Sequence, residues 1–280
     1  MTELNRGYAK ALKLAKEHYE NFPVVSFFVP AALREDVAII YWFARTADDI
    51  ADEGESEPGE RIRHLDRFQA RFEATLASNY QDSLDEALHN TIVSRKLDPV
   101  LFLDLISAFR QDITVNRYEK FESILDYCRR SANPVGRLIL QLNGYNDEAR
   151  YLLSDKICTS LQLINFYQDL KIDFLRNRLY IPLKEISSFG LNESIMSESI
   201  RNRRIDELIR HQVMRAEKLM IEGLPLIKML KGRLRIQIAA TCKGGLAIAG
   251  KIADSGYTSY LQRPKLSRLD YFNLFIKSIF

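Results

Sequence analysis

The sequence is poor in cysteine and has no long apolar run, and both absences narrow the class of protein. It has 3 cysteines among 280 residues, and no two of them form a CxxC pair. Well-separated cysteines of this kind are typical of reduced thiols in the cytoplasm and argue against a disulfide framework. No apolar run approaches the roughly 18 residues of a membrane-spanning helix. The N-terminus is charged throughout, unlike a signal peptide, so we expect a cytoplasmic protein.

An excess of charge of one sign is also absent. The chain carries 40 basic and 37 acidic residues, for a formal net charge of +3. This balance gives no reason to propose nucleic acid as a partner, because such proteins usually present a strongly basic face. The aromatic-rich last segment, LDYFNLFIKSIF, is expected to pack on the core, with a contact to the inner face of the membrane as the alternative.

Alternating strand patterns, repeats and low-complexity tracts are nearly absent as well. Apolar residues instead recur at spacings of three and four along almost the whole chain, which is typical of amphipathic helices. This pattern predicts one all-α domain, residues 1–280, with eight to ten helices. The predicted helical stretches are 4–19, one beginning at Pro30, 60–78, 83–96, 99–113, 121–143, 147–174, 204–222 and 233–254.

Acidic residues are concentrated at 44–53, which reads ARTADDIADE. Helical spacing places Asp48 on one face with Val37, Ile40, Tyr41 and Ala44. Asp52 lies one turn further along, and Asp49 is also close. The pattern thus predicts a carboxylate ladder at the end of a core-facing stripe, which is costly to bury without a partner. Hard divalent cations are suitable partners; a solvated helix end is the alternative, and this segment alone leaves both open.

A second set of oxygen ligands occurs at 162–173, which reads QLINFYQDLKID. Asn165, Asp169 and Asp173 follow one another at four-residue spacing, so they share one helical face. Gln162 lies one turn before Asn165. Ile157 and Leu161 continue the stripe backwards, so this face also begins as core and then becomes polar.

The two polar sets suggest a shared ligand. If the two helices face each other across a cavity, they can hold several Mg²⁺ ions between them. Magnesium usually completes its coordination with phosphate oxygens, so a diphosphate is the expected ligand. Arg45 lies three residues before Asp48, and Arg178 lies five residues after Asp173. Beside acidic ladders, these arginines are interpreted as a clamp for phosphate oxygens.

Five motifs together resemble the head-to-head prenyl synthase family, which comprises squalene, dehydrosqualene and phytoene synthases. They are HYENFPVVSFFVP, FARTADDIADE, YCRRSANPVGRL at 127–138, NFYQDLKID, and RNRLYIP at 176–182. The resemblance covers nearly the whole chain and implies a class I isoprenoid synthase, an all-α helical bundle around a central cavity. SANPVG, HYENFPV and RPKLS at 263–267 are most similar to one branch, the hydroxysqualene synthases of bacterial hopanoid biosynthesis.

This resemblance implies a reaction and its partners. The branch ionises presqualene diphosphate with Mg²⁺, three ions per site, and water captures the rearranged carbocation to give hydroxysqualene. It works beside a presqualene diphosphate synthase and a flavin-dependent reductase. We expect no NADPH, because Lys243-Gly244-Gly245 is not a dinucleotide-binding fingerprint. The membrane anchor of eukaryotic-type squalene synthases is also not expected.

The resemblance also carries site roles onto particular residues. The implied metal ligands are Asp48, Asp49, Asp52, Asn165, Asp169 and Asp173. The implied diphosphate-side residues are His18, Arg45, Arg178 and Tyr180, and Tyr127 lines the site. The other implied substrate contacts are Phe22, Tyr41, Val135 and Gln162, and further candidate walls of the apolar pocket are Phe27 and Leu161; plain core is the alternative for each wall.

Two departures from the family pattern bear on the product. After His18 the chain has Tyr19-Glu20-Asn21 where relatives often carry hydroxyl or basic residues. This puts a full second diphosphate site in doubt, and with it the condensation of two farnesyl diphosphates. Gly245 falls where relatives often place a tyrosine, and we expect the lost bulk to make room for the water that captures the cation.

Three alternatives remain open at this level. A presqualene diphosphate, dehydrosqualene or phytoene synthase would share every metal ligand and differ in substrate. A di-iron carboxylate bundle is suggested only by one ExxH, Glu86 to His89, and such sites need two copies. A non-catalytic helical interaction protein would leave both ladders without a purpose and would not be stabilised by Mg²⁺ with diphosphate.

Overall fold

The computed structural model describes residues 2–17, 29–52, 57–194 and 200–266. Within these ranges the chain forms helices, with one isolated parallel bridge between Arg117 and Leu179 and no extended strand. The all-α prediction is therefore confirmed. His18, Phe22 and Phe27 lie outside the described residues.

The chain divides into two compact units, each described by itself below. The first comprises Met1–Thr114 and Pro134–Asp147, and the second comprises Val115–Asn133 and Glu148–Phe280. The expected single domain over residues 1–280 stays a prediction.

The first unit contains five long helices, a short 3₁₀ helix and most of a further helix. They are α1 (Glu3–Glu17), η3 (Ala31–Leu33), α2 (Arg34–Asp52), α3 (Pro58–Leu76), α4 (Ser83–Arg95), α5 (Pro99–Thr114) and α7 (Asn133–Leu142). Local signals set several ends: Pro58 occupies the first turn of α3, where its missing N–H costs nothing. The Asp82 carboxylate caps α4 by accepting from the backbone N–H groups of Leu84 and Asp85.

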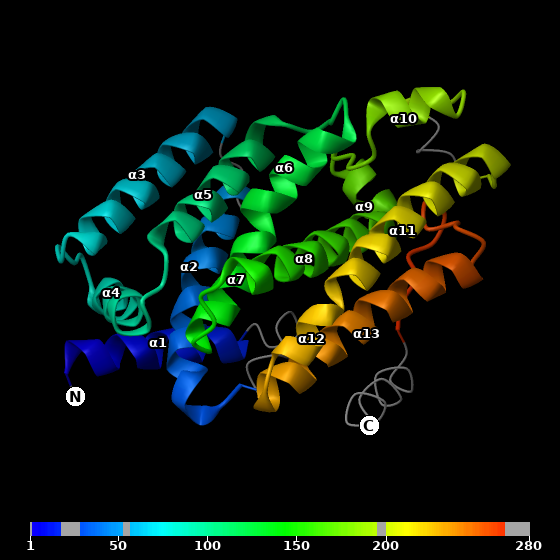
Figure 1. The fold of residues 1–280 in the computed structure, drawn as a ribbon. Helices are drawn as coiled ribbons and strands as arrows, with labels where there is room; N and C mark the ends of the chain where they lie inside the picture. Colours follow the sequence, from blue (N-terminus) through cyan, green and yellow to red (C-terminus); the bar gives the residue numbers. More distant parts are fainter. Residues whose placement is uncertain (1, 18–28, 53–56, 195–199, 267–280) are drawn as a thin grey trace. The chain divides into compact units, whose positions relative to one another are not determined.

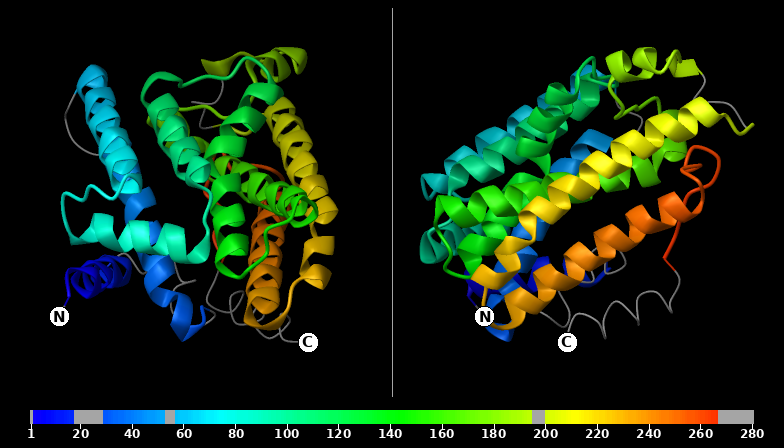
Figure 2. Two further views of the ribbon diagram at one scale, coloured as in Figure 1. Left: turned by 60° about the vertical axis from the view of Figure 1, so that its left-hand side comes forward. Right: turned by 45° about the vertical axis from the view of Figure 1, so that its right-hand side comes forward.

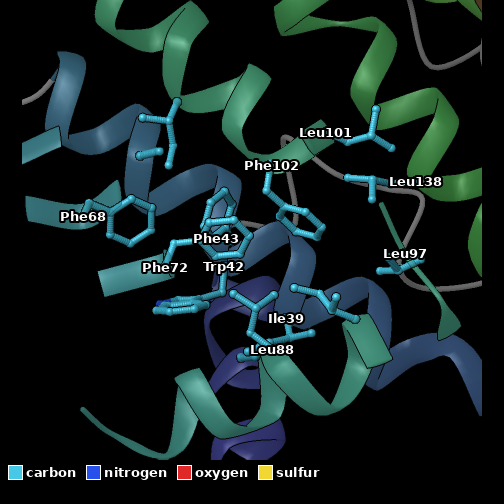
Figure 3. Packing of buried hydrophobic residues seen from close by; sticks show 14 of the residues in the cluster. Ile39, Trp42, Phe43, Phe68, Phe72, Leu88, Leu97, Leu101, Phe102 and Leu138 are labelled. Carbon is cyan, nitrogen blue, oxygen red and sulfur yellow. The ribbon is translucent and has the colours of Figure 1, made fainter. Parts of the chain in front are cut away.

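The core of the first unit is built around aromatic side chains on α2, α3 and α5. Phe43 lies with its ring centroid 5.0 Å from those of Phe68, Phe72 and Phe102, and Figure 3 shows these rings gathered between the helices. Figure 1 shows α3 running beside α5, in keeping with their contacts. The ends of α2 are thereby fixed on a rigid core, which positions its acidic last turns.

The second unit is built on long helices that run side by side. Its helices are α6 (Phe121–Ser131), α8 (Glu148–Gln168), α9 (Leu170–Leu175), α10 (Leu183–Ser188), α11 (Arg203–Gly223), α12 (Pro225–Met229) and α13 (Gly232–Asp254). Helix α8 packs against α11 (Figure 1), and α13 lies along both (Figure 2). The buried Ser160 hydroxyl donates to the carbonyl of Ala216 at 2.6 Å and ties α8 to α11.

The helix boundaries differ from the predicted ones at three places. The predicted helix 121–143 is two helices, α6 and α7, since Pro134 follows the break and restricts the residue before it. The predicted helix 147–174 is interrupted at Asp169, which separates α8 from α9. Pro30 precedes a 3₁₀ turn, and α2 begins only at Arg34. With the short α10 and α12, the described ranges contain thirteen α-helices rather than eight to ten.

None of the helices in the described part of the chain is both long and apolar enough to cross a membrane. All three cysteines lie in that part and none is bonded to another, which confirms the prediction of free thiols.

Candidate active site

The first acidic ladder lies on the last two turns of α2, in the first unit. Arg45 forms ion pairs with both neighbouring carboxylates: its Nε lies 2.7 Å from Asp49 Oδ1, and its Nη1 lies 3.5 Å from Asp48 Oδ2. Asp52 is the exposed final residue of the helix. The predicted grouping of Arg45 with Asp48 and Asp49 is therefore confirmed as a local arrangement.

Tyr41 lies one turn before Arg45, and these charges affect the pKa of its hydroxyl. Burial raises the pKa of the Tyr41 hydroxyl, and the Arg45 guanidinium opposes this rise. The carboxylates of Asp49 and Asp48 raise the pKa further. Tyr41, Arg45 and the two carboxylates thus form one electrostatic group on a single face of α2.

The prediction that this face of α2 faces the core holds only in part, because Val37, Ile40 and Tyr41 pack against the core but are not its deeply buried residues. The deeply buried residues of the helix are Ala38, Ile39, Trp42, Phe43, Ala47 and Ala51. The residues that precede Asp48 on its own face are only half-buried; they are Val37, Ile40, Tyr41 and Ala44. The aromatic core contacts draw Trp42 and Phe43 inward, so the helix turns its acidic face partly to solvent. Asp48 and Asp49 are correspondingly 39% and 37% exposed, which suits a cation-binding face better than a sealed core.

The second ladder spans the junction of α8 and α9, in the second unit. Burial along its stripe is graded, because Ile157 is buried, Leu161 is half-buried and Asn165 is exposed. Although Asp169 interrupts the helix, its backbone N–H donates to the Asn165 carbonyl, and the Asp173 N–H donates to the Asp169 carbonyl, both at 2.9 Å. The i, i+4 hydrogen bonding therefore continues across the break, so Asn165, Asp169 and Asp173 stay on one helical face.

The surroundings of the Asp173 carboxyl shift its pKa strongly. Burial raises the pKa of the Asp173 carboxyl to about 7, and the neighbouring Asp169 carboxylate adds to the rise. Three arginines act in the opposite direction, namely Arg178, Arg176 and Arg263. A half-buried carboxyl next to a second carboxylate holds its proton to higher pH, because two like charges are costly at short range. Bound positive charge would relieve that cost.

Arg263 is a partner of this ladder that the sequence reasoning did not identify. Its guanidinium donates from Nε and Nη2 to the two carboxylate oxygens of Asp169, a bidentate pair. The segment RPKLS was singled out as a branch motif, but nothing in its spacing reveals a contact with a residue 94 positions earlier in the chain.

Two predicted site residues, Tyr127 and Tyr180, belong to a buried aromatic cluster in the second unit. Phe166 of α8 stacks on Tyr180 with ring centroids 3.7 Å apart and planes 4° apart. Tyr127 of α6 lies 5.9 Å from Tyr180, and Tyr118 lies 5.7 Å from it. The sequence reasoning missed Phe166 and Tyr118, although Phe166 directly follows Asn165.

The remaining predicted contacts are distributed over both units. Gln162 is half-buried on α8, Arg178 is half-buried after α9, and Val135 is half-buried on α7. Arg178 is anchored through its backbone N–H, which donates to the Asp173 carbonyl at 2.8 Å. His89, from the ExxH considered above, is hydrogen-bonded through Nδ1 to the Tyr80 hydroxyl.

The expectation that Gly245 leaves room for water is contradicted. Gly245 is buried, and a Cβ at this position would lie 2.6 Å from Leu161 Cδ2 and 3.2 Å from Met220 Cε. The volume that a larger residue would fill is already occupied by these two side chains, because α13 packs closely on α8 and α11 here. Gly245 is thus explained by helix packing.

The donor atoms are compatible with Mg²⁺ as the cofactor implied by the resemblance. Among the described residues, no three His, Cys, Asp or Glu side chains come together closely enough to hold a metal by themselves. Magnesium, however, usually takes one or two carboxylates and completes its shell with water and phosphate oxygens. The pair Asp169 and Asp173 with the Asn165 amide matches that requirement.

Comparisons with known proteins agree with this architecture. The family model for squalene/phytoene synthase matches residues 15–270. The hydroxysqualene synthase of Sinorhizobium fredii is 34% identical over 242 residues, covering 85% of this chain and 80% of the relative. That of Rhodopseudomonas palustris is 31% identical, covering 82% and 79%. The crystal structure of squalene synthase HpnC from Alicyclobacillus acidocaldarius superposes with a TM-score of 0.86 at 35% identity, covering 91% of this chain and 96% of that one.

The helical architecture is therefore that of the all-α isoprenoid synthases. More narrowly, the chain belongs to the squalene/phytoene synthase family, because the family model covers most of its length.

Proposed function

We propose that this protein converts presqualene diphosphate to hydroxysqualene in a Mg²⁺-dependent reaction that releases diphosphate. The observation that carries the chemical part is the pair Asp169 and Asp173, in which burial and, after it, the neighbouring Asp169 carboxylate raise the pKa of the Asp173 carboxyl to about 7. Such a pair calls for bound cations. The choice of substrate is supported by similarity over most of the chain to relatives named hydroxysqualene synthase.

The roles of the acidic ladders follow from their donor atoms. Asn165, Asp169 and Asp173 offer oxygen ligands in the second unit, and Asp48, Asp49 and Asp52 offer such ligands in the first unit. When bound, Mg²⁺ supplies positive charge that stabilises the diphosphate as it leaves. Arg45 and Arg178 are held beside the acidic groups and are suited to neutralise outer phosphate oxygens.

The buried aromatic cluster has a separate role in this proposal. Its members, Tyr118, Tyr127, Phe166 and Tyr180, are nearly excluded from solvent, and such apolar surroundings prevent water from capturing a carbocation too early. Aromatic faces also attract cations through their quadrupole. Tyr41, Val135 and Gln162 remain proposed contacts of the hydrocarbon chains or the diphosphate, as do His18 and Phe22.

Product analysis tests the proposal directly. The purified protein is incubated with Mg²⁺ and presqualene diphosphate, and in parallel with farnesyl diphosphate, without NADPH. We expect hydroxysqualene from presqualene diphosphate and no turnover of farnesyl diphosphate. A hydrocarbon or a diphosphate ester as the main product would contradict the assignment. Asp169→Asn should lose turnover by at least about a hundredfold, the scale of a lost electrostatic catalytic group.

The second candidate is a synthase that condenses two prenyl diphosphates head-to-head. It is favoured by the solved relative at 35% identity, which is named squalene synthase HpnC. Consumption of farnesyl diphosphate by the purified protein would select this candidate. Both candidates predict that Mg²⁺ with inorganic diphosphate raises the melting temperature of the wild-type protein, because a ligand of the native state stabilises it.

A further inference from the structure

The segment that follows α13 is fastened to the junction of α8 and α9. We call residues 255–266 the strap. Its first part is fixed by Tyr260, whose fully buried hydroxyl donates to Asp206 Oδ1 at 3.0 Å and accepts from the Asn202 N–H at 2.8 Å. The chain turns back after α13 through Gly256 and Tyr257, both with positive φ.

Three side-chain contacts then join the strap to the ligand-bearing junction. Gln168 Nε2 donates to the Pro264 carbonyl at 2.7 Å, and Lys171 Nζ donates to the Leu261 carbonyl at 3.5 Å. Between them, Arg263 pairs with both oxygens of Asp169. The three junction residues belong to a stretch of only four, so the strap covers the point where α8 ends.

The central contact competes with metal binding. A bidentate guanidinium donates to both oxygens of a carboxylate, and a cation that uses those oxygens must approach the same positive group. Placing Mg²⁺ beside an attached guanidinium is unfavourable since like charges repel. Arg263 and a metal ion therefore compete for the same two oxygens of Asp169, so that binding of one weakens binding of the other.

We propose that Arg263 is the counter-ion of Asp169 in the metal-free protein and that Mg²⁺ binding displaces it, so that the strap is released from the α8–α9 junction. This inference rests on the proposed function, because it takes Asp169 as a metal ligand. It adds a regulatory contact: loading the site with metal is coupled to detachment of the 261–264 backbone. Arg263 acts here through Asp169 as a positioning residue.

The test uses Arg263→Gln and Mg²⁺ alone as the probe, without diphosphate, so that no second anion is present for Arg263. Melting temperature is followed as Mg²⁺ is titrated. We expect the half-saturating Mg²⁺ concentration to fall by about three- to fivefold in the variant, the scale of one part-exposed ion pair. The metal-free variant should also melt at a lower temperature than the wild type, since the Asp169–Asp173 repulsion is no longer screened.

Controls separate this effect from a general loss of positive charge. Lys265→Gln removes a charge from the same strap, and Lys265 is exposed, so its Mg²⁺ titration should match the wild type. Arg263→Lys keeps the charge without the two-pronged geometry and should fall between the two. In the Asp169→Asn background, adding Arg263→Gln should change the melting temperature much less than it does in the wild type, because the ion pair is already broken and only the weaker attraction of Arg263 to Asp173 remains.

Two failures are distinguishable. If wild-type protein is stabilised by Mg²⁺ with inorganic diphosphate but Arg263→Gln binds Mg²⁺ as the wild type does, or more weakly, the displacement proposal is wrong and the proposed function is unaffected. If neither Mg²⁺ alone nor Mg²⁺ with diphosphate changes the wild-type melting temperature, the metal assignment itself fails and the displacement proposal fails with it.

Discussion

At the scale of single residues, Asp173 gives the structure its clearest pH dependence. Its carboxyl has an ordinary pKa of 3.8, which the folded protein raises to about 7. A carboxyl with a raised pKa stabilises the folded state while it is protonated, and this contribution is lost as pH rises through the folded pKa. The metal-free protein should therefore become less stable between about pH 4 and pH 7.

The Asp173→Asn variant tests this assignment. In buffer with a metal chelator, we expect the variant to melt several degrees higher than the wild type at pH 8 and to lose much of the decline between pH 5 and pH 7. Asp254→Asn, an exposed position at the end of α13, serves as the control and should keep the wild-type profile. Parallel profiles for wild type and Asp173→Asn would show that Asp173 is not the responsible group.

Single residues also show how much of the site could be predicted from the sequence. Spacings of three and four placed Asp48 with Asp49 and Arg45, and Asn165 with Asp169 and Asp173, because helical periodicity is a local property. Arg263 and Asp169 are separated by 94 positions, and their pairing depends on how the strap folds back. No local pattern encodes such a contact.

At the scale of helices, close approach of backbones decides where glycine is required. Gly7 of α1 packs against α4, and a Cβ at this position would lie 1.9 Å from the Ser83 carbonyl oxygen. Backbone cannot yield as a side chain can, so Gly7→Ala must push the two helices apart. We expect a loss of about 1–3 kcal/mol in the free energy of unfolding, measured by urea denaturation.

Gly59 offers a matched control within the same unit. It lies in the first turn of α3, and the nearest heavy atom to a Cβ there is the end of the Arg63 side chain at 4.0 Å. Gly59→Ala should be neutral or slightly stabilising, since alanine favours helix. Equal losses in the two variants would mean that helix α1 does not approach α4 as closely as described.

The helix boundaries show which features sequence periodicity can predict and which it cannot. Long amphipathic stretches such as α3, α11 and α13 were predicted within two residues at each end, because capping and turn residues mark their boundaries. The breaks at Ala132 and Asp169 were missed, since both lie within continuous periodic patterns. The burial of the Asp48 face of α2 was also overestimated. Adjacent apolar stripes on a helix differ by a small rotation, and here the aromatic packing of Phe43 draws the neighbouring stripe inward.

At the scale of the whole molecule, the family and the helical class were predictable and the internal packing was not. Motifs distributed along the chain identified the family, which the match over residues 15–270 confirms. Gly245 shows the limit: its sequence position suggested an open space, whereas Leu161 and Met220 fill the volume beside it. The way in which the side chains of three helices pack together cannot be predicted from the residue spacing within one of them.

The rates at which the three free cysteines react with a thiol reagent measure how well the folded protein shields its interior. Burial raises the pKa of the Cys128 thiol to about 12, and that of Cys242 also to about 12. Both thiols are therefore protected by lack of access and by lack of thiolate, the reactive form. Cys158 is only half-buried. In native protein, a thiol-reactive chromophore should modify at most one cysteine rapidly, whereas denaturant should expose all three.

The variant Cys158→Ser separates local from global exposure in the same assay. It should abolish the fast native phase and leave two thiols that react only at the rate at which the protein opens. Mg²⁺ with inorganic diphosphate should slow that remaining reaction, because a bound ligand lowers the population of open states. Fast reaction of Cys128 or Cys242 in native Cys158→Ser would contradict the packing of α6, α8 and α13 on which the second acidic ladder depends.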